Sequence, residues 1–270
     1  MSAAPRPPLI LGLVSDLFFA VPIEQAARTL GYAVQWADRD ETLLAARGLE
    51  FVRRVVDWQP AAVLVELGGD RLPWREWVAA LKTSPATRRI PVIAFGPHVD
   101  LALRAEAQAV GCDVILAKSA LLRDLPGLLQ KQVRRVDTTA LDADCAAPLS
   151  AEAVAGIALF DRGEFFEAHE ALEYAWNADP GPARELYRGL LQVAVAYLQI
   201  ERGNFDGALK MFLRLRQWLE PLPDECRGVD VARLRAEAQA AQAELEALGP
   251  QRLNEFDRAL FRPVPMVAAR

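Results

Sequence analysis

Four residues that carry a charge or a hydroxyl, and one glycine, stand at the ends of short apolar runs in the first half of the chain. Ser15 and Asp16 follow the first run, Glu66 closes the third, Gly96 follows the fourth and Lys118 follows the fifth. If these runs are parallel strands of one sheet, the five positions meet at its carboxyl edge, where such sheets bind their ligands. Opposite charges held close together there either pair with each other or contact a charged ligand.

A second group of polar residues lies in the other half of the chain at helical spacing. His169 falls inside an apolar stripe whose other members are Phe165, Ala168, Leu172, Ala175 and Trp176. Glu173 borders this stripe. On the next predicted helix, a polar line of Arg188, Gln192 and Gln199 runs beside the apolar residues. The pattern predicts a buried hydrogen-bonded network between the two helices.

Two interpretations of this second group remain open. In the first, His169 and Glu173 share a metal or act as a base with its orienting carboxylate, and Arg188 binds an anion. The protein would then be a hydrolase-type enzyme or a small-anion-binding protein. In the second, which we favour because the domain has a single histidine and no cysteine beside it, His169 is a core residue held by Glu173 or Gln192. We predict no catalytic residue, no metal and no cofactor, and a pocket formed by His169, Glu173, Arg188, Gln192, Gln199 and Trp176.

The elements that must position the first group alternate along the chain. Apolar runs predict strands over 9–14, 33–36, 62–66, 92–95 and 114–116, and helix-length segments cover 22–30, 42–58, 74–81, 101–110 and 120–134. This alternation predicts an α/β fold with a parallel sheet covered by helices on both faces. The middle runs are apolar throughout, as expected for strands buried on both sides.

The length of 270 residues predicts two domains. An α/β domain over 1–134 precedes a segment, 135–149, that mixes Asp, Thr, Ala and Pro without a period and indicates a linker. Ser150 predicts a helix N-terminus, and an all-α domain follows over 150–262. The tail 263–270 contains two prolines, and we expect it to lie along the surface or to fray.

Composition argues against several classes of protein. The formal net charge of −5 favours neither nucleic acid nor an anionic membrane as a partner. The run at 9–14 is too short to span a bilayer, and no basic segment leads into a signal-peptide core. The cysteines, Cys112, Cys145 and Cys226, are odd in number and far apart. We therefore expect a cytoplasmic protein without disulfides.

The first half resembles response-regulator receiver domains over about residues 9–134. The resemblance rests on the order of the strands, the lengths between them and the segment GCDVILAKS. It implies a five-stranded, flavodoxin-like sheet. In that family, the acidic pair after strand one helps to hold Mg²⁺ and the aspartate ending strand three accepts a phosphoryl group. A Thr or Ser that ends strand four responds to the phosphoryl group, and a lysine after strand five contacts it.

Three of these five positions depart from the family's pattern. The acidic pair reads Ser15-Asp16, Glu66 replaces the aspartate and Gly96 replaces the hydroxyl residue, whereas Lys118 is retained. A missing carboxylate weakens Mg²⁺ binding, and the longer glutamate misplaces the nucleophile for in-line attack. We therefore predict a pseudo-receiver that is not phosphorylated, in which Glu66 and Lys118 form a fixed ion pair.

The second half resembles the prokaryotic family called domain of unknown function 309 over about residues 150–222. The matching positions are Gly163, Glu167-Ala168-His169-Glu170, Trp176, Arg184, Gly189-Leu190, Gln192 and Arg202-Gly203-Asn204. Related sequences often carry a histidine near Gln199, so a second histidine would be missing here. The resemblance implies a helical domain, and the role of the family is not settled.

The helical half also contains an internal repeat. The segments 162–176 and 202–216 share Arg-Gly-x-Phe-x-x-Ala, but they are about 40 residues apart, whereas tetratricopeptide repeats recur every 34 residues. A distorted repeat and an ordinary helical hairpin with a glycine turn explain the pattern equally well. From both halves, we predict a non-catalytic regulatory or scaffold protein. A partner protein or a second copy would dock on the receiver-like domain, and the helical domain would bind protein or a small ligand.

Overall fold

The computed structural model describes residues 8–69, 71–133 and 138–267. The chain forms two compact units, residues 1–135 and 136–270. None of the helices in the described ranges has both the length and the apolar character that crossing a membrane requires.

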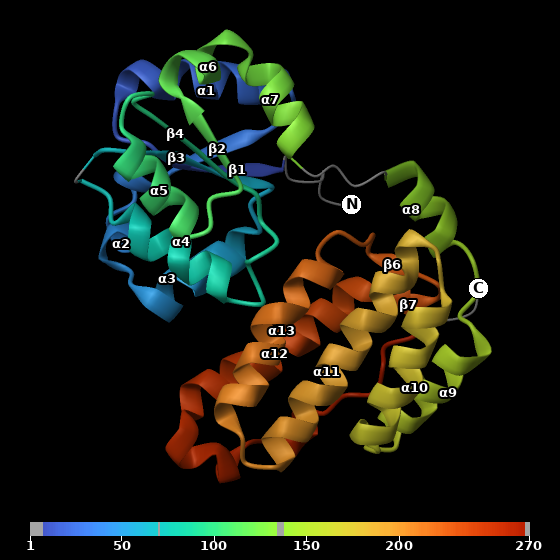
Figure 1. Ribbon diagram of the computed structural model, residues 1–270. Coiled ribbons are helices and arrows are strands. Elements are labelled where there is room, and N and C mark those ends of the chain that lie inside the picture. The colour runs from blue at the N-terminus through green and yellow to red at the C-terminus, as the bar shows by residue number, and fades with distance from the viewer. Residues whose placement is uncertain (1–7, 70, 134–137, 268–270) are drawn as a thin grey trace. The chain divides into compact units, whose positions relative to one another are not determined.

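The first unit contains a five-stranded sheet in which every neighbouring pair of strands is parallel (Figure 1). The strand order is β2-β1-β3-β4-β5, which is the flavodoxin-like, doubly wound order. This confirms the predicted receiver-type α/β fold. The strands are β1 (Leu9–Leu13), β2 (Ala33–Trp36), β3 (Ala62–Glu66), β4 (Val92–Gly96) and β5 (Val114–Ala117).

The sheet separates two apolar cores because successive side chains of a strand point to opposite faces. On β3, Val63 and Val65 pack with the helices α3, α4 and α5. The alternate residues Ala62 and Leu64 pack with α1, α6 and α7 on the other face. Glu66 has the same parity as Leu64, and it ends this second row at the carboxyl edge. The bounds are α1 (Leu17–Thr29), α2 (Glu41–Ala45), α3 (Gly48–Trp58), α4 (Trp74–Thr83), α5 (Leu101–Ala109), α6 (Lys118–Arg123) and α7 (Leu125–Gln132), with the 3-10 turn η1 (Ala37–Arg39).

Three helix boundaries differ from the sequence expectation. The first helix begins at Leu17 because Asp16 caps it, and Pro22 lies inside it. The segment expected as one helix over 42–58 is broken between α2 and α3, where Ala46 takes an extended conformation. The segment expected over 120–134 is broken at Asp124, which caps α7 by accepting the amide of Gly127.

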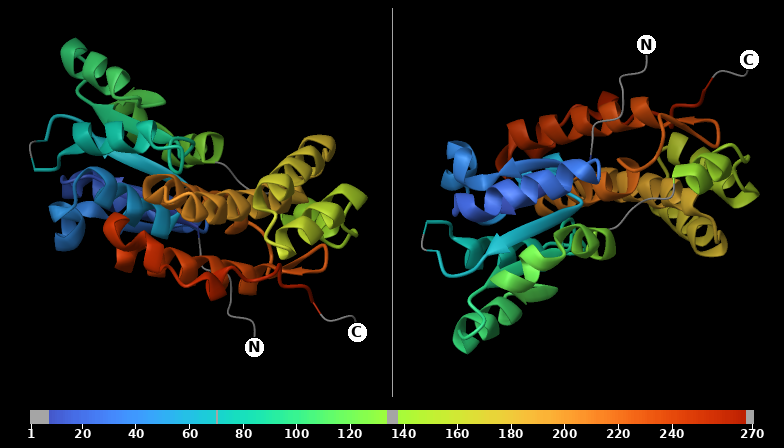
Figure 2. Two further views of the ribbon diagram at one scale, coloured as in Figure 1. Left: turned by 90° about the horizontal axis from the view of Figure 1, so that it is seen from below. Right: turned by 90° about the horizontal axis from the view of Figure 1, so that it is seen from above.

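The second unit is built mainly of helices, and α11 packs against both α10 and α12 (Figures 1 and 2). Ser150 caps α9 by accepting the amide of Ala153, as predicted. The helices are α8 (Thr138–Cys145), α9 (Ala151–Asp161), α10 (Phe165–Ala178), α11 (Glu185–Glu201), α12 (Phe205–Leu219) and α13 (Val231–Leu248), with the 3-10 turns η2 (Pro182–Arg184), η3 (Pro250–Glu255) and η4 (Arg258–Leu260).

The two glycines of the internal repeat end helices in the same way. Gly163 follows α9 with φ +79° and Gly203 follows α11 with φ +69°. Both lie in the left-handed region, which a glycine adopts without a steric penalty. The repeat therefore marks two helix-to-helix turns, α9 to α10 and α11 to α12.

Two details of this half differ from the sequence expectation. The segment expected as a linker over 135–149 contains α8, which buries Leu141 and Cys145; residues 135–137 lie outside the described part. The all-helical expectation misses a hairpin of β6 (Glu225–Cys226) and β7 (Val229–Asp230). Its two turn residues, Arg227 and Gly228, have φ of +53° and +79°, as a two-residue type I′ turn requires.

The tail extends this hairpin. Met266 forms an isolated antiparallel bridge with Val229, and the amide of Val267 donates to Gly228. Val264 is buried, and its amide donates to the Asp161 carboxylate at 2.8 Å. The tail up to Val267 is therefore hydrogen-bonded to the helical unit.

Candidate functional site

The topology places all five residues singled out in the first half at one edge of the sheet. Ser15 and Asp16 follow β1, Glu66 ends β3 and Lys118 follows β5 as the first residue of α6. Because all these strands are parallel, their carboxyl ends lie at one edge of the sheet. Gly96 ends β4 at the same edge.

The Glu66 carboxylate is the centre of this cluster. Its Oε1 accepts a hydrogen bond from Lys118 Nζ at 2.9 Å, and its Oε2 accepts the backbone amides of Ser15 at 3.2 Å and of Asp16 at 3.0 Å. The side chain of Glu66 is only 8% exposed. Both carboxylate oxygens are therefore engaged by groups of the same domain, and the burial of this charge is compensated by an ion pair and two amides.

Lys118 has a second contact in the cluster. Its Nζ lies 4.6 Å from the centroid of the Phe19 ring, in cation–π range. Phe19 in turn packs against Phe95 with their ring centroids 5.2 Å apart. The ammonium is therefore held by an anion and by an aromatic ring.

Asp16 has a local structural role. Its Oδ1 accepts the amide of Phe18 at 2.9 Å, which caps α1. Within the described ranges, no group of three or more His, Cys, Asp or Glu side chains is placed to hold a metal ion. Of the five predicted positions at this edge, two carry a carboxylate that a cation could bind, Asp16 and Glu66.

Gly96 is in close contact with Leu67. A Cβ built on Gly96 would lie 2.9 Å from the Leu67 Cβ, which is closer than real Cβ contacts come. Leu67 is buried, so it has little room to move. The packing around β4 therefore leaves no space for the Thr or Ser that the family carries here.

The second predicted group does not assemble as expected. Within the described part of the chain, His169 is half-buried and makes no hydrogen bond, and Glu173 is exposed. Gln199 accepts a hydrogen bond from the Asn204 side chain at the far end of α11. Gln192 is buried, and its Oε1 has no hydrogen-bond partner. The network predicted between His169, Glu173 and the polar line is therefore wrong, because Glu173 lies on the exposed face of α10.

Arg188 is instead stacked between two indoles. Its guanidinium carbon lies 4.4 Å from the ring centroid of Trp176 on α10 and 3.7 Å from that of Trp218 on α12. Its NH1 is 3.7 Å from a Glu185 carboxylate oxygen. The sequence singled out Trp176 and Arg188 separately and missed Trp218. Trp218 could have been considered from the sequence, because a guanidinium often stacks on the aromatic side chains of a neighbouring helix.

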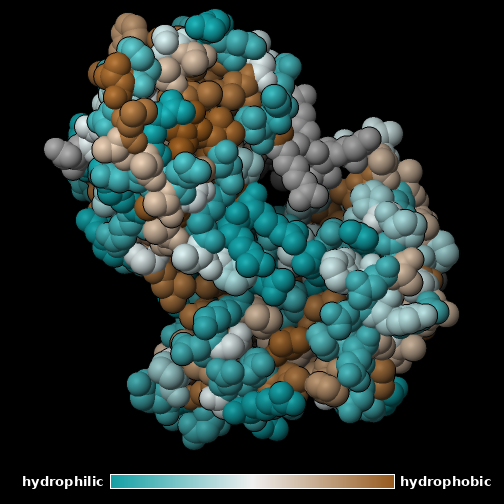
Figure 3. Space-filling model, viewed as in Figure 1, coloured by the Kyte–Doolittle hydropathy of each residue, from teal (hydrophilic) through white to brown (hydrophobic). Residues whose placement is uncertain are grey.

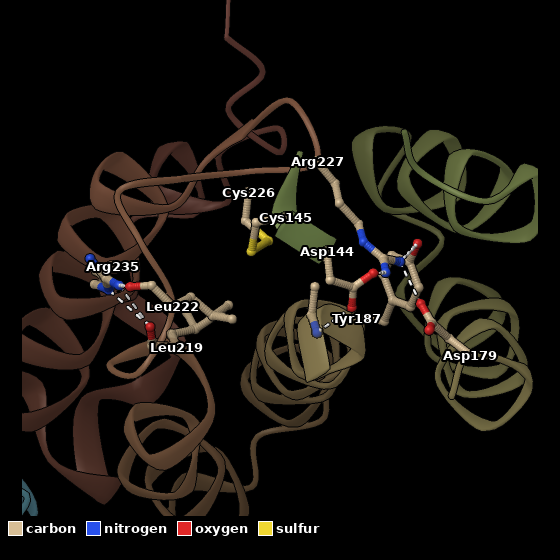
Figure 4. Close-up of a disulfide and its surroundings, with 10 residues drawn as sticks. Asp144, Cys145, Asp179, Tyr187, Leu219, Leu222, Cys226, Arg227 and Arg235 are labelled. Atoms are coloured by element: carbon tan, nitrogen blue, oxygen red, sulfur yellow. Dashed lines mark hydrogen bonds and ion pairs between the residues drawn. A yellow bond between two sulfur atoms is a disulfide. The ribbon is translucent and has the colours of Figure 1, made fainter. Parts of the chain in front are cut away.

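A larger polar cluster was missed altogether, and it surrounds a disulfide (Figure 4). Cys145 of α8 is bonded to Cys226 of β6 across 81 residues of sequence. Next to it, the buried Arg227 donates to the carboxylates of Asp144 and Asp179 and to the Tyr187 hydroxyl. The expectation of no disulfide is therefore wrong, because the fold brings together two cysteines that sequence distance had set apart.

These contacts attach α8 and the hairpin to the rest of the helical unit. The Asp144 carboxylate also accepts the amide of Ala183 at 2.8 Å, and the amide of Arg227 donates to the Cys145 carbonyl at 2.6 Å. Hydrogen bonds from Arg227 to its neighbours raise the pKa of this guanidinium against the opposing effect of burial. Arg227 is therefore a charged residue whose contacts hold several segments of this unit together.

The helices that carry the second group also carry a family match. Residues 153–211 match the family model described as Domain of unknown function (DUF309). The DUF309 segment runs from α9 into α12 and includes His169, Glu173, Trp176, Arg188, Gln192 and Gln199. Trp218 and Arg227 lie outside it.

One curated relative is an uncharacterized protein of Aquifex aeolicus. It is 26% identical over 96 residues, which are 35% of this chain and 29% of that protein. The chain therefore matches less than a third of the length of this relative.

Solved structures resemble about half of the chain. A putative response regulator from Chloroflexus aurantiacus is 19% identical, covers 46% of this chain and 96% of its own, and has a TM-score of 0.38. The receiver domain of a sensor histidine kinase from Pseudomonas aeruginosa is 24% identical, with coverages of 47% and 97% and a TM-score of 0.37. The chemotaxis response regulator CheY4 of Vibrio cholerae is 17% identical, with coverages of 46% and 98% and a TM-score of 0.37.

Proposed function

We propose that this chain is a non-catalytic regulatory protein whose receiver-like domain acts by binding a partner protein and does not carry a phosphoryl group. The observation that supports this is the engagement of both Glu66 oxygens, by Lys118 on one side and by the amides of Ser15 and Asp16 on the other. A carboxylate nucleophile needs a free oxygen aligned with the phosphorus atom that it attacks. Glu66 has its oxygens committed before any donor arrives.

The surroundings of Glu66 support the same proposal. Mg²⁺ needs several oxygen ligands in octahedral geometry, and Asp16 uses a carboxylate oxygen to cap α1. At Gly96 the contact with Leu67 leaves no space for a hydroxyl residue that could follow a phosphate. These contacts support a site that neither accepts a phosphoryl group nor responds to one.

The carboxyl edge also offers an apolar surface to a partner. Five large apolar side chains of the loops and helix starts at this edge are more than half exposed: Leu17, Phe18, Val21, Val99 and Leu101. Hydrophobic surface interrupts the hydrophilic surface in the upper part of the first unit in Figure 3. Exposed apolar groups gathered at one edge are typical of a protein-binding surface.

The proposal is tested by incubating the full chain with acetyl phosphate and Mg²⁺ and measuring the intact mass. We expect no phosphorylated species from the wild type. An acyl phosphate on Glu66 can be reduced to the corresponding alcohol, which is stable and can be located by peptide mapping. Finding this alcohol at Glu66 would refute the proposal. A receiver domain that acetyl phosphate does phosphorylate is measured in parallel, to show that the assay detects an acyl phosphate.

Binding at the carboxyl edge is tested separately by size-exclusion chromatography with light scattering. The variant Phe18→Glu places a charge in the apolar surface and leaves Glu66 and Lys118 intact. If a second copy is the partner, the wild type is a dimer and this variant is a monomer. A wild-type monomer would exclude a second copy as the partner at this surface.

A further inference from the structure

The outer face of α10 carries two exposed aromatic side chains. Phe166 is 45% exposed and Tyr174 is 65% exposed. They are eight residues apart, with Glu170 halfway between them. Because residues four apart on a helix are surface neighbours, Phe166, Glu170 and Tyr174 form one continuous row. A carboxylate thus lies between two accessible rings.

This face also carries negative charges that no positive side chain neutralises in the described part of the chain. Glu167, Glu170 and Glu173 are exposed, and none of them makes an ion pair with a residue in the described part of the chain. The sequence of α10, Phe165–Ala178, contains no lysine or arginine. Only Glu167 lies in the first turn, where the helix dipole favours a carboxylate. The spacing of three residues from Glu167 to Glu170 and from Glu170 to Glu173 makes the charges repel each other.

The neighbouring helices do not share this arrangement. On α11 a Glu185 oxygen lies 3.7 Å from an Arg188 nitrogen, and on α13 a Glu237 oxygen lies 2.9 Å from an Arg233 nitrogen. On α12 the corresponding distance from Glu220 to Arg216 is 3.5 Å. Within the described part of the helical unit, α11, α12 with its C-terminal cap, and α13 thus each have a carboxylate within reach of an arginine, whereas α10 has no such pair.

We propose that the outer face of α10 docks a lysine- or arginine-rich segment of a partner protein. One cationic side chain of that segment pairs with Glu170 and lies against the Phe166 and Tyr174 rings, where cation–π attraction adds to the ion pair. Further cations pair with Glu167 and Glu173. The charge of the face selects a basic protein segment and repels polyanions such as nucleic acids and anionic membranes.

The face gives the segment a spacing as well as a charge. The carboxylates of Glu167, Glu170 and Glu173 recur at every third residue, so they rise along the α10 axis in steps of about 4.5 Å. A partner helix with arginine at every third position presents cations at the same interval. This makes the position of the cations, and not only their number, part of the recognition.

The test uses the full chain and a fluorescein-labelled alanine-based peptide with arginine at every third position, measured by fluorescence anisotropy at low and at high salt. The triple variant E167Q/E170Q/E173Q should bind at least tenfold more weakly than the wild type. Tyr174→Ala should weaken binding about two- to fivefold, which corresponds to one exposed cation–π contact. Binding should also weaken as salt screens the charges.

A matched control separates this face from the general negative charge of the chain. Glu201 is exposed on a different helix, α11, and Glu201→Gln removes one charge. This variant should bind the peptide as the wild type does. The proposal is overturned if the triple variant retains wild-type affinity, if Tyr174→Ala has no effect, or if Glu201→Gln weakens binding as much as Glu170→Gln. Circular dichroism checks that each variant keeps its helices, so that lost binding is not lost folding.

Discussion

Lys118 Nζ and Glu66 Oε1 lie 2.9 Å apart although the two residues are separated by 52 positions in the sequence. The pair joins the ends of β3 and β5, and the other Glu66 oxygen joins them to the loop after β1. A strong contact between three strand ends fixes the edge of the sheet at which receiver-type folds bind their ligands. This contact is a consequence of topology, because parallel strands end at one edge.

Removing the ammonium should destabilise the first unit. Lys118→Met leaves the Glu66 carboxylate buried with two amides and no cation, and we expect a loss of about 2 kcal/mol in the free energy of unfolding, less than for a fully buried pair because Lys118 is partly exposed. Urea denaturation measures the loss. Lys131→Met, which removes an exposed lysine of α7, should change stability by less than about 0.5 kcal/mol. Equal stability of the two variants would show that the ion pair contributes nothing.

Introducing the hydroxyl residue at Gly96 should cost stability as well. The Cβ of Gly96→Thr meets the Leu67 Cβ, and overpacking of this kind costs about 1–3 kcal/mol. Leu67→Ala removes the obstructing atoms. The double variant should therefore lose less free energy of unfolding than the two single variants lose together. Thermal unfolding of the four proteins gives the coupling. Strict additivity would mean that Leu67 is not the obstacle.

Reducing the disulfide should destabilise the second unit. The Cys145–Cys226 bond closes a loop of 81 residues, for which the chain-entropy model gives roughly 4–5 kcal/mol. Cys145→Ser should therefore lower the unfolding temperature of this unit without any reductant. Cys112→Ser changes a free cysteine of the other unit and serves as the control. Titration of the denatured, unreduced wild type should find one free thiol, and three would contradict the bond.

Cys112 should resist alkylation until the solution is strongly alkaline. Burial, and then the nearby Asp113, raise the pKa of this thiol to about 11, against the opposing effect of Lys82. Iodoacetamide should therefore react slowly with the native chain at pH 8 and rapidly in denaturant. Because the folded pKa lies above the unfolded one, the thiol contributes stability that is complete below about pH 9 and is lost toward pH 11. Cys112→Ser removes this pH dependence, and a native thiol that reacts at the unfolded rate would contradict the burial.

The receiver-type fold and its edge site could be read from the sequence for a physical reason. Strands buried on both faces need continuous apolar runs, and the rule that parallel strands end together places Ser15, Asp16, Glu66 and Lys118 at one edge. The runs predicted β3 with its bounds, and Ser150 predicted the start of α9, because both signals are local. What sequence could not give was the role of Asp16 as a cap and the contact of Gly96 with Leu67.

In the helical half, the sequence determined the helices and left their contacts to the tertiary structure. Helical spacing placed His169 and Glu173 near one stripe, but the packing of α10 against α9 and α11 decided that Glu173 faces outward. Spacing also gave no reason to join Cys145 to Cys226, or to stack Arg188 on Trp218. Cys145 and Cys226 are 81 residues apart, and Arg188 and Trp218 lie on two successive helices, so both contacts depend on how these segments pack. Periodicity reports which face of one element is apolar, and only the assembled core decides which other element covers it.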